Sequence, residues 1–321
     1  MRGQSISDHV NATDVTTVPV GTSFFQQRYL FGFAGQAEVS VYLRTQAAKE
    51  EAVRIPEIMD AWAQSQSRVQ HLLSSEAGAA ESILIDDLPT EKAEYVQRIK
   101  NSDLFQKTFQ HQIVFASVEI DKLVAAQRTV NLDYVDRIKA SLPDEPKTDE
   151  IYDTCLSLER AMNPIQHLEL GPNAHVFSSP STDLRFLGAF EKRLTQEDLA
   201  YAQTGGLPAA AIISFVGYGA SPVNVFVSNG RVVLNNGFHR VYALRAKGIT
   251  KIPVVMQVAN NAALEFPPTI AGISRDYLLG HPRPVLMKDF FDPDLSTTIK
   301  VQNRIRVVTL QVNAGQHDVP T

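Results

Sequence analysis

The sequence predicts an α+β protein in which a mixed β-sheet packs against helices. Three observations support this prediction. Residues 223–258 read as a β-hairpin, a helix and a further strand, and residues 113–142 read as a strand followed by a helix. The chain of 321 residues is also 44% hydrophobic, so it can bury a sizeable core. At roughly 150 residues per domain, about two domains are expected.

The hairpin is the clearest local pattern. Valines alternate with other residues along 223–227, and Asn229-Gly230 supplies two adjacent positions for positive φ in a tight turn. After the return strand, Asn235-Asn236-Gly237 interrupts the β pattern. Apolar residues at helical spacing then continue until Gly248, which is typical of a helix end, and a strand resumes over 252–258.

The predicted strand-to-helix junction at residues 236–240 suits a phosphate group. Unpaired backbone N–H groups and the positive end of the helix dipole converge at a helix N-terminus. Gly237 lets the backbone approach a ligand, His239 can donate through a ring nitrogen, and Arg240 offers a planar fork of donors. The alternative is an ordinary helix start with a capping Asn, a satisfied His and a solvated Arg.

The same residues carry a family resemblance. Leu234–Leu244, with Gly248 and a strand that begins Ile252-Pro253-Val254, resembles the ParB/sulfiredoxin superfamily signature of strand, Gly-x-His/Arg-Arg, helix and Pro-Val strand. Residues 118–141, which include Gln127-Arg128, are more loosely similar to the first strand and helix of ParB N-terminal domains. The resemblance spans about residues 113–258 and is interrupted by an insertion at 143–207.

Members of this superfamily bind nucleotides with the Gly-x-His-Arg-like junction on the phosphates. They include CTP-hydrolysing DNA clamps, sulfiredoxins, free-serine kinases and proposed nucleases. The resemblance assigns nucleotide binding to Asn236, Gly237, Phe238, His239 and Arg240, with Gln127 and Arg128 as further candidates. Phe238 stands where sulfiredoxins have their catalytic Cys, which argues against sulfinic-acid reduction. Asn236 stands where many members have Asp or Glu.

The resemblance implies an enzyme that hydrolyses a nucleoside triphosphate, ATP or CTP, or transfers its phosphoryl group to a small molecule or a protein. His239 and Arg240 are the expected catalytic groups, and Mg²⁺ is the expected cofactor because it bridges phosphate oxygens. Glu119 and Asp121, on one face of a predicted strand, are candidate catalytic carboxylates that could hold this ion. The alternative for this pair is a solvated strand face beside Lys122.

Two other functions stay open. One is a DNA-associated protein that uses CTP as a switch or cleaves nucleic acid, which the net charge of −5 disfavours. Prolines after Val258 also break the region where partition proteins carry a helix-turn-helix. The other is a non-catalytic scaffold that binds a protein partner through its N-terminal part.

Along the chain, residues 1–18 are expected to form a flexible arm and residues 19–105 an α+β lobe. This lobe would contain short strands at 29–33 and 39–43 and helices at 45–74 and 90–100. The nucleotide-binding domain covers 106–258, and its insertion is expected to be helical, with helices at 149–162 and 195–203. Residues 259–321 form a C-terminal extension, with a short helix in 270–280 and strands in 299–312.

The single cysteine, Cys155, lies on the apolar stripe Ile151, Cys155, Leu158 and Met162, which favours a buried structural thiol. One cysteine excludes an intramolecular disulfide and fits a reducing compartment. No apolar run approaches a membrane span and residues 1–22 lack a signal-peptide pattern, so a cytoplasmic protein is expected. His167 and His175 lack the sequence spacing of metal ligands, so no protein-bound metal is predicted.

Overall fold

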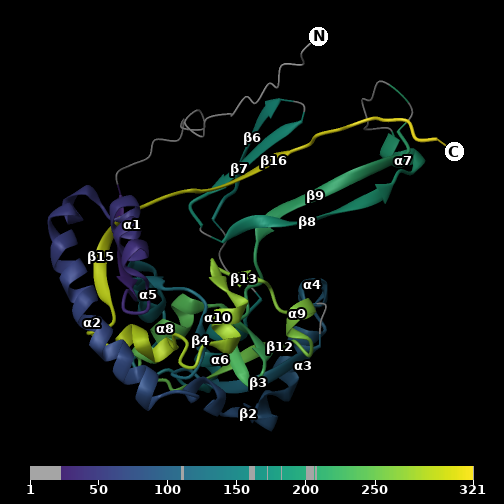
Figure 1. Ribbon diagram of the computed structural model, residues 1–321. Coiled ribbons are helices and arrows are strands. Elements are labelled where there is room, and N and C mark those ends of the chain that lie inside the picture. The colour runs from purple at the N-terminus through teal and green to yellow at the C-terminus, as the bar shows by residue number, and fades with distance from the viewer. Residues whose placement is uncertain are drawn as a thin grey trace.

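The computed structural model describes residues 23–109, 112–158, 163–171, 173–181, 183–199, 206 and 208–320. The predicted arm at residues 1–18 lies outside these ranges. The described part contains helices and several β-sheets, which confirms the predicted α+β class (Figure 1). None of the helices that it contains has the length and apolar character needed to cross a membrane.

A six-stranded mixed sheet forms the centre of the molecule, in the order β2-β3-β12-β10-β11-β4. Its strands are β2 (Ile85–Asp87), β3 (Ile113–Glu119), β4 (Val124–Ala125), β10 (Asn224–Ser228), β11 (Arg231–Asn236) and β12 (Lys251–Val258). The predicted hairpin is confirmed, because β10 and β11 pair antiparallel and both Asn229 and Gly230 have positive φ. Strand β12 runs parallel to β10, and β4 runs parallel to β11.

Helices α5 (Leu132–Ala140), α6 (Thr148–Leu156) and α8 (Phe238–Ala246) pack together beside this sheet. Asn131 caps α5 as its residue type suggests, since its side-chain oxygen accepts a hydrogen bond of 2.9 Å from the Tyr134 N–H. The core between these helices and the sheet contains Cys155, Leu234 and Leu244, all 0% exposed. The prediction that Cys155 is a buried structural thiol is therefore confirmed, and burial raises its pKa to about 12.

The N-terminal segment contains β1 (Phe24–Tyr29), α1 (Gln36–Gln46), the 3₁₀ helices at Lys49–Arg54, Ala79–Ser82 and Thr90–Lys92, α2 (Ile55–Ser75), α3 (Ala93–Lys100) and α4 (Asp103–Thr108). The strand predicted at residues 39–43 is wrong, because these residues lie in α1. Val39 and Leu43 are 0% and 1% exposed, and residues four apart share one face of a helix. The helix predicted at 45–74 is α2, which begins at Ile55 with Pro56 in its first turn, while residues 45–46 belong to α1. Of the strand predicted at 29–33, only Tyr29 lies in a strand, at the end of β1.

Strand β1 lies in a three-stranded sheet between β15 (Thr297–Gln302) and β5 (Thr129–Asn131). The segments expected as an N-terminal lobe and a C-terminal extension thus share one sheet. The extension also contains α9 (Ala262–Glu265), β13 (Thr269–Ile270), β14 (Ile273–Ser274), α10 (Arg275–Gly280), the 3₁₀ helix η5 (Met287–Phe291) and β16 (Arg306–Gln311). The short helix and the terminal strands that the sequence predicts in this extension are confirmed.

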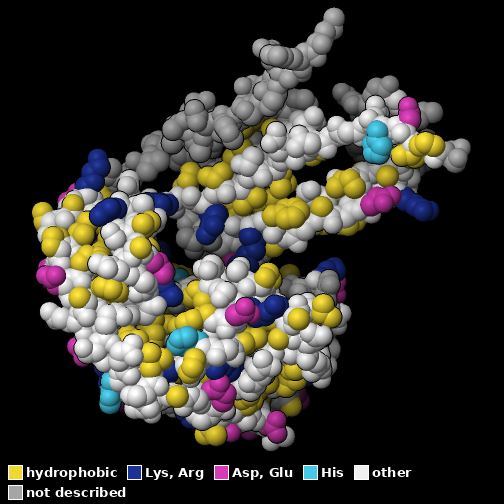
Figure 2. Space-filling model, viewed as in Figure 1, with side chains coloured by type: hydrophobic (Ala, Val, Ile, Leu, Met, Phe, Trp, Pro, Cys, Tyr) yellow, Lys and Arg dark blue, Asp and Glu magenta, His cyan; other side chains and the backbone are white. Residues whose placement is uncertain are grey.

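The insertion contains helices where they were predicted, α6 at Thr148–Leu156 and a short α7 at Gln196–Leu199, but it also contains long β-strands, so the prediction of a helical insertion holds only in part. Its strands are β6 (Gln166–Gly171), β7 (Ala174–Ser179) and β8 (Leu184–Arg193), and β9 (Ala210–Tyr218) follows just after it. Strand β16 pairs with β7, and β8 pairs with β9. These ribbons extend away from the body of the molecule (Figure 1), and hydrophobic side chains gather along them (Figure 2). Aromatic residues such as Phe186, Phe190 and Phe215 favour such pleated pairs.

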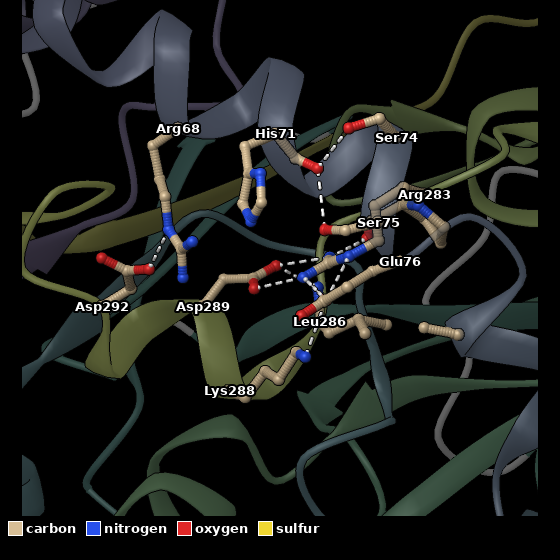
Figure 3. A network of polar contacts seen from close by, with 12 residues as sticks. Arg68, His71, Ser74, Ser75, Glu76, Arg283, Leu286, Lys288, Asp289 and Asp292 are labelled. Atoms are coloured by element: carbon tan, nitrogen blue, oxygen red, sulfur yellow. Dashed lines mark hydrogen bonds and ion pairs between the residues drawn. The ribbon is translucent and has the colours of Figure 1, made fainter.

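A buried ion-pair network joins the end of α2 to η5 (Figure 3). The Arg283 side chain is completely buried and donates to both oxygens of Asp289, at 2.7 and 2.8 Å, and to Glu76 at 3.0 Å. Lys288 lies 2.7 Å from the same Glu76 oxygen. Burial alone would lower the pKa of Arg283, but the hydrogen bonds and charges of Asp289 and Glu76 outweigh it and raise this pKa.

Replacing Arg283 by Met is expected to lower the free energy of unfolding by about 3–5 kcal/mol, because Asp289 is left as an unpaired charge in the interior. Denaturant unfolding at neutral pH measures this loss. The matched control is Arg68→Met, which removes a partly exposed ion pair with Asp292 and should cost less than about 1 kcal/mol. Equal losses in the two variants would contradict the assigned role of the network.

Candidate functional site

The turn from β11 into α8 depends on a glycine. Gly237 has φ of 104°, in the left-handed region, and a Cβ atom at this position would lie 2.7 Å from a methyl carbon of Val223. Any other residue would therefore be strained and would also collide with a buried valine. This glycine fixes where the chain leaves the sheet and begins the helix.

The first turn of α8 has neither a capping side chain nor a negative charge. Gly237 occupies the N-cap position, so no side chain caps the helix, and the first turn contains no acidic residue. Asn236, the capping candidate, instead donates its side-chain N–H to the carbonyl of Ala220. The first N–H groups of a helix have no acceptor within the helix, and the positive end of the helix dipole lies among them. This combination attracts a phosphate.

His239 is held against α5. Its Nε2 accepts a hydrogen bond of 3.1 Å from the backbone N–H of Asn131, and its ring meets the edge of the Tyr134 ring at 5.1 Å between centroids. Burial, followed by the nearby charge of Arg240, lowers the His239 pKa to about 4. The imidazole is therefore neutral at physiological pH, with its proton on Nδ1. It can offer a hydrogen-bond donor but no charge.

Arg240 supplies the positive charge of this junction. Its Nη1 donates to the carbonyl of Thr154 in the last turn of α6, at 3.2 Å. His239 and Arg240 thus contact different helices, α5 and α6, on either side of the helix start. Phe238, between Gly237 and His239, is buried in the core at 5% exposure, so its side chain is not available to a ligand.

Gln127 and Arg128 reach the same edge of the sheet, because β4 runs parallel to β11 and both strands end there. The Gln127 side chain donates to the carbonyl of Thr129 at 2.7 Å. Arg128 pairs through Nη1 with Glu38 of α1, while its buried Nε has no partner among the described residues. The structure thus brings the Gln127-Arg128 backbone to the junction, but it turns the Arg128 guanidinium toward α1.

The candidate carboxylates lie elsewhere. Asp121 accepts hydrogen bonds of 2.6 and 3.1 Å from Arg245, in the last turn of α8. A helix of nine residues is about 13 Å long, so Asp121 sits at the far end of α8 from Gly237. Glu119 faces Lys251 across β3 and β12 and also pairs with Lys122 at 3.1 Å. The structure does not bring either side chain to the junction.

A cleft of about 500 Å³ opens beside the buried network of Figure 3. Its lining includes Arg68, Arg245 and Lys288, which come from α2, α8 and η5. No local sequence pattern predicts this cleft, because these residues are far apart along the chain. Each cation already pairs with a carboxylate, as in the contact of 3.0 Å between Arg68 and Asp292. The cleft therefore has little uncompensated charge for an anion.

Comparisons with protein-family models, curated proteins and solved structures find no match to this chain. The assignment to the ParB/sulfiredoxin superfamily therefore stays a proposal that rests on the residues of the junction.

The buried, neutral His239 makes stability depend on pH. Its folded pKa of about 4 lies below the ordinary value of 6.5, so its contribution is complete above pH 6.5 and is lost as the pH falls toward 4. The loss should reach on the order of 3 kcal/mol. His239→Gln keeps an acceptor for the Asn131 N–H but does not titrate. Denaturant unfolding at pH 7 and pH 4.5 should show a smaller loss for this variant than for wild type; parallel losses would refute the assignment.

Gly237→Ala is expected to reduce the free energy of unfolding by about 2 kcal/mol or more, through backbone strain and collision with Val223. Gly248→Ala is the matched control, since Gly248 also has positive φ but has no atom within 4 Å of the added Cβ position. In thermal or denaturant unfolding, Gly237→Ala should be clearly less stable than the Gly248→Ala control. If Gly237→Ala were as stable as the control or more stable, the Val223 side chain would have to move aside without loss of stability.

Proposed function

We propose that the β11–α8 junction binds the phosphate groups of a nucleotide, as in the ParB/sulfiredoxin superfamily. The observation that carries this proposal is the start of α8 itself. It combines a left-handed glycine, a first turn without a capping or acidic side chain, and the guanidinium of Arg240. Helix starts with these properties bind anions through backbone N–H groups and the helix dipole.

The chemistry that follows is hydrolysis of ATP or CTP, or transfer of its phosphoryl group to a small molecule or a protein. In such reactions the protein mainly positions the phosphates and stabilises the charge that develops on them. Backbone N–H groups of the first turn would hold oxygens, and Arg240 would supply charge. His239 would add a neutral donor through Nδ1.

Mg²⁺ fits this proposal only as an ion that arrives with the nucleotide. Asn236 carries an amide where a carboxylate would be needed, and Glu119 and Asp121 are engaged in other ion pairs. Mg²⁺ commonly keeps several waters and binds mainly through substrate phosphates.

A scaffold function is the second candidate, and one observation favours it. The β8–β9 ribbon leaves Phe186, Leu187, Phe190 and Phe215 between 47% and 51% exposed. Groups of exposed large apolar side chains often mark surfaces that bind another protein. A DNA-dependent CTP switch is the third candidate, and nucleotide titration with and without DNA separates all three.

The test is equilibrium binding of ATP, CTP, GTP and ADP with Mg²⁺ to the full chain. We expect one nucleotide to bind wild type and Arg240→Ala to weaken it about tenfold or more, because charge-assisted hydrogen bonds to phosphate are lost. Arg245→Ala is the control, since it removes the same charge from the opposite end of α8. This control should bind as wild type does.

Phosphate release, or transfer to an added acceptor, would then support an enzyme. Nucleotide binding that strengthens only when DNA is present would favour the DNA-associated function. No binding of any nucleotide to wild type, or equal weakening in Arg240→Ala and Arg245→Ala, would overturn the phosphate site and leave the scaffold.

A further inference from the structure

Two histidines that are eight positions apart in the sequence meet on the exposed face of the β6–β7 hairpin. His167 lies directly opposite Phe177, and Glu169 lies directly opposite His175. Residues that face each other across an antiparallel pair point to the same side, and so do residues two apart along a strand. His167, Glu169, His175 and Phe177 therefore share one face of the sheet.

This shared face is the outer one. Val176 and Ser178, which alternate with His175 and Phe177 along β7, are 3% and 9% exposed, so the opposite face of β7 is covered, while Leu168 and Leu170 on that side of β6 are 48% and 46% exposed. His167 and Glu169 are exposed, and His175 is partly exposed. An ion from solvent can therefore reach the imidazole nitrogens without any rearrangement of the fold.

The distance between two ring nitrogens of this pair matches that between two ligands of one ion. Nε2 of His167 lies 3.2 Å from Nδ1 of His175. Two nitrogens bound at 2.0–2.1 Å to one tetrahedral zinc ion are about 3.3 Å apart. The His167 ring also stacks on Phe177, with 4.7 Å between centroids and 20° between planes, which fixes its orientation. Little side-chain entropy remains to be lost when an ion binds.

Glu169 offers an oxygen donor beside this pair. Its carboxylate makes no ion pair with any side chain that the structure describes. No three His, Cys, Asp or Glu side chains of the described ranges converge in a way that could hold a metal. Glu169 must therefore change rotamer to complete a third ligand, and an exposed glutamate can do so freely.

We propose that His167 and His175, with Glu169 as a third ligand, form a binding site for a divalent transition metal such as Zn²⁺. Imidazole nitrogens suit Zn²⁺, Ni²⁺ and Cu²⁺, and a carboxylate oxygen is a common companion ligand for zinc. The remaining position stays open to water. The spacing along the chain did not predict this site, because only the strand register brings the two rings together. The site is independent of the phosphate-binding proposal.

The experiment is isothermal titration of Zn²⁺ into the full chain, treated with chelator and carrying no added histidine tag. We expect one Zn²⁺ per chain for wild type, and His167→Gln or His175→Gln should each weaken binding at least tenfold. Glu169→Gln should weaken it less. His71→Gln, at an exposed histidine on α2, is the matched control and should bind as wild type does.

A second measurement keeps the result clear if a variant folds poorly. Zn²⁺ should raise the melting temperature of wild type and of His71→Gln, but not that of His175→Gln. Failure of wild type to bind Zn²⁺, Ni²⁺ or Cu²⁺ would overturn the site and leave only a hydrogen bond between the two rings. Unchanged binding in His175→Gln would overturn it as well.

Discussion

The close contact between Gly237 and Val223 is the constraint on which the candidate site depends. Val223 precedes β10, and its backbone N–H donates to the carbonyl of Cys155 at 2.6 Å. The hairpin, the end of α6 and the start of α8 therefore meet at one packed point. Because nothing larger than a hydrogen fits on Gly237, the N–H groups of the first helical turn are held in a fixed direction.

The chemistry at this point is set by burial as much as by residue type. His239 and Arg240 are neighbours in the sequence, and both were expected to neutralise phosphate charge. In the structure their contacts differ, since the His239 ring packs on α5 while the Arg240 guanidinium donates to α6. Desolvation then keeps the imidazole neutral. Only Arg240 is left as a permanent charge, and this is why it is the most informative residue for a binding experiment.

Features that depend on contiguous residues could be predicted from the sequence, and features that depend on distant partners could not. The Asn229-Gly230 turn, the Asn131 cap and the helix ahead of Gly248 each have their signal within a few residues. Val39 and Leu43 fit both a strand and a helix until burial shows which face they share. The ion pair between Arg283 and Glu76 joins residues more than two hundred positions apart, so no local sequence pattern predicts it. The contact between His167 and His175 could not be predicted either, because it depends on the register of β6 against β7.

The sheet β15-β1-β5 has a consequence for how this chain is made. Its middle strand comes from residues 24–29, one neighbour from residues 129–131 and the other from residues 297–302. During synthesis on the ribosome, β1 is made before both of its neighbours, and its second edge is covered only after residues 297–302 have emerged. Pairings of such high sequence separation form late and slowly. An incomplete chain therefore exposes an open strand edge, which is where proteins associate wrongly with one another.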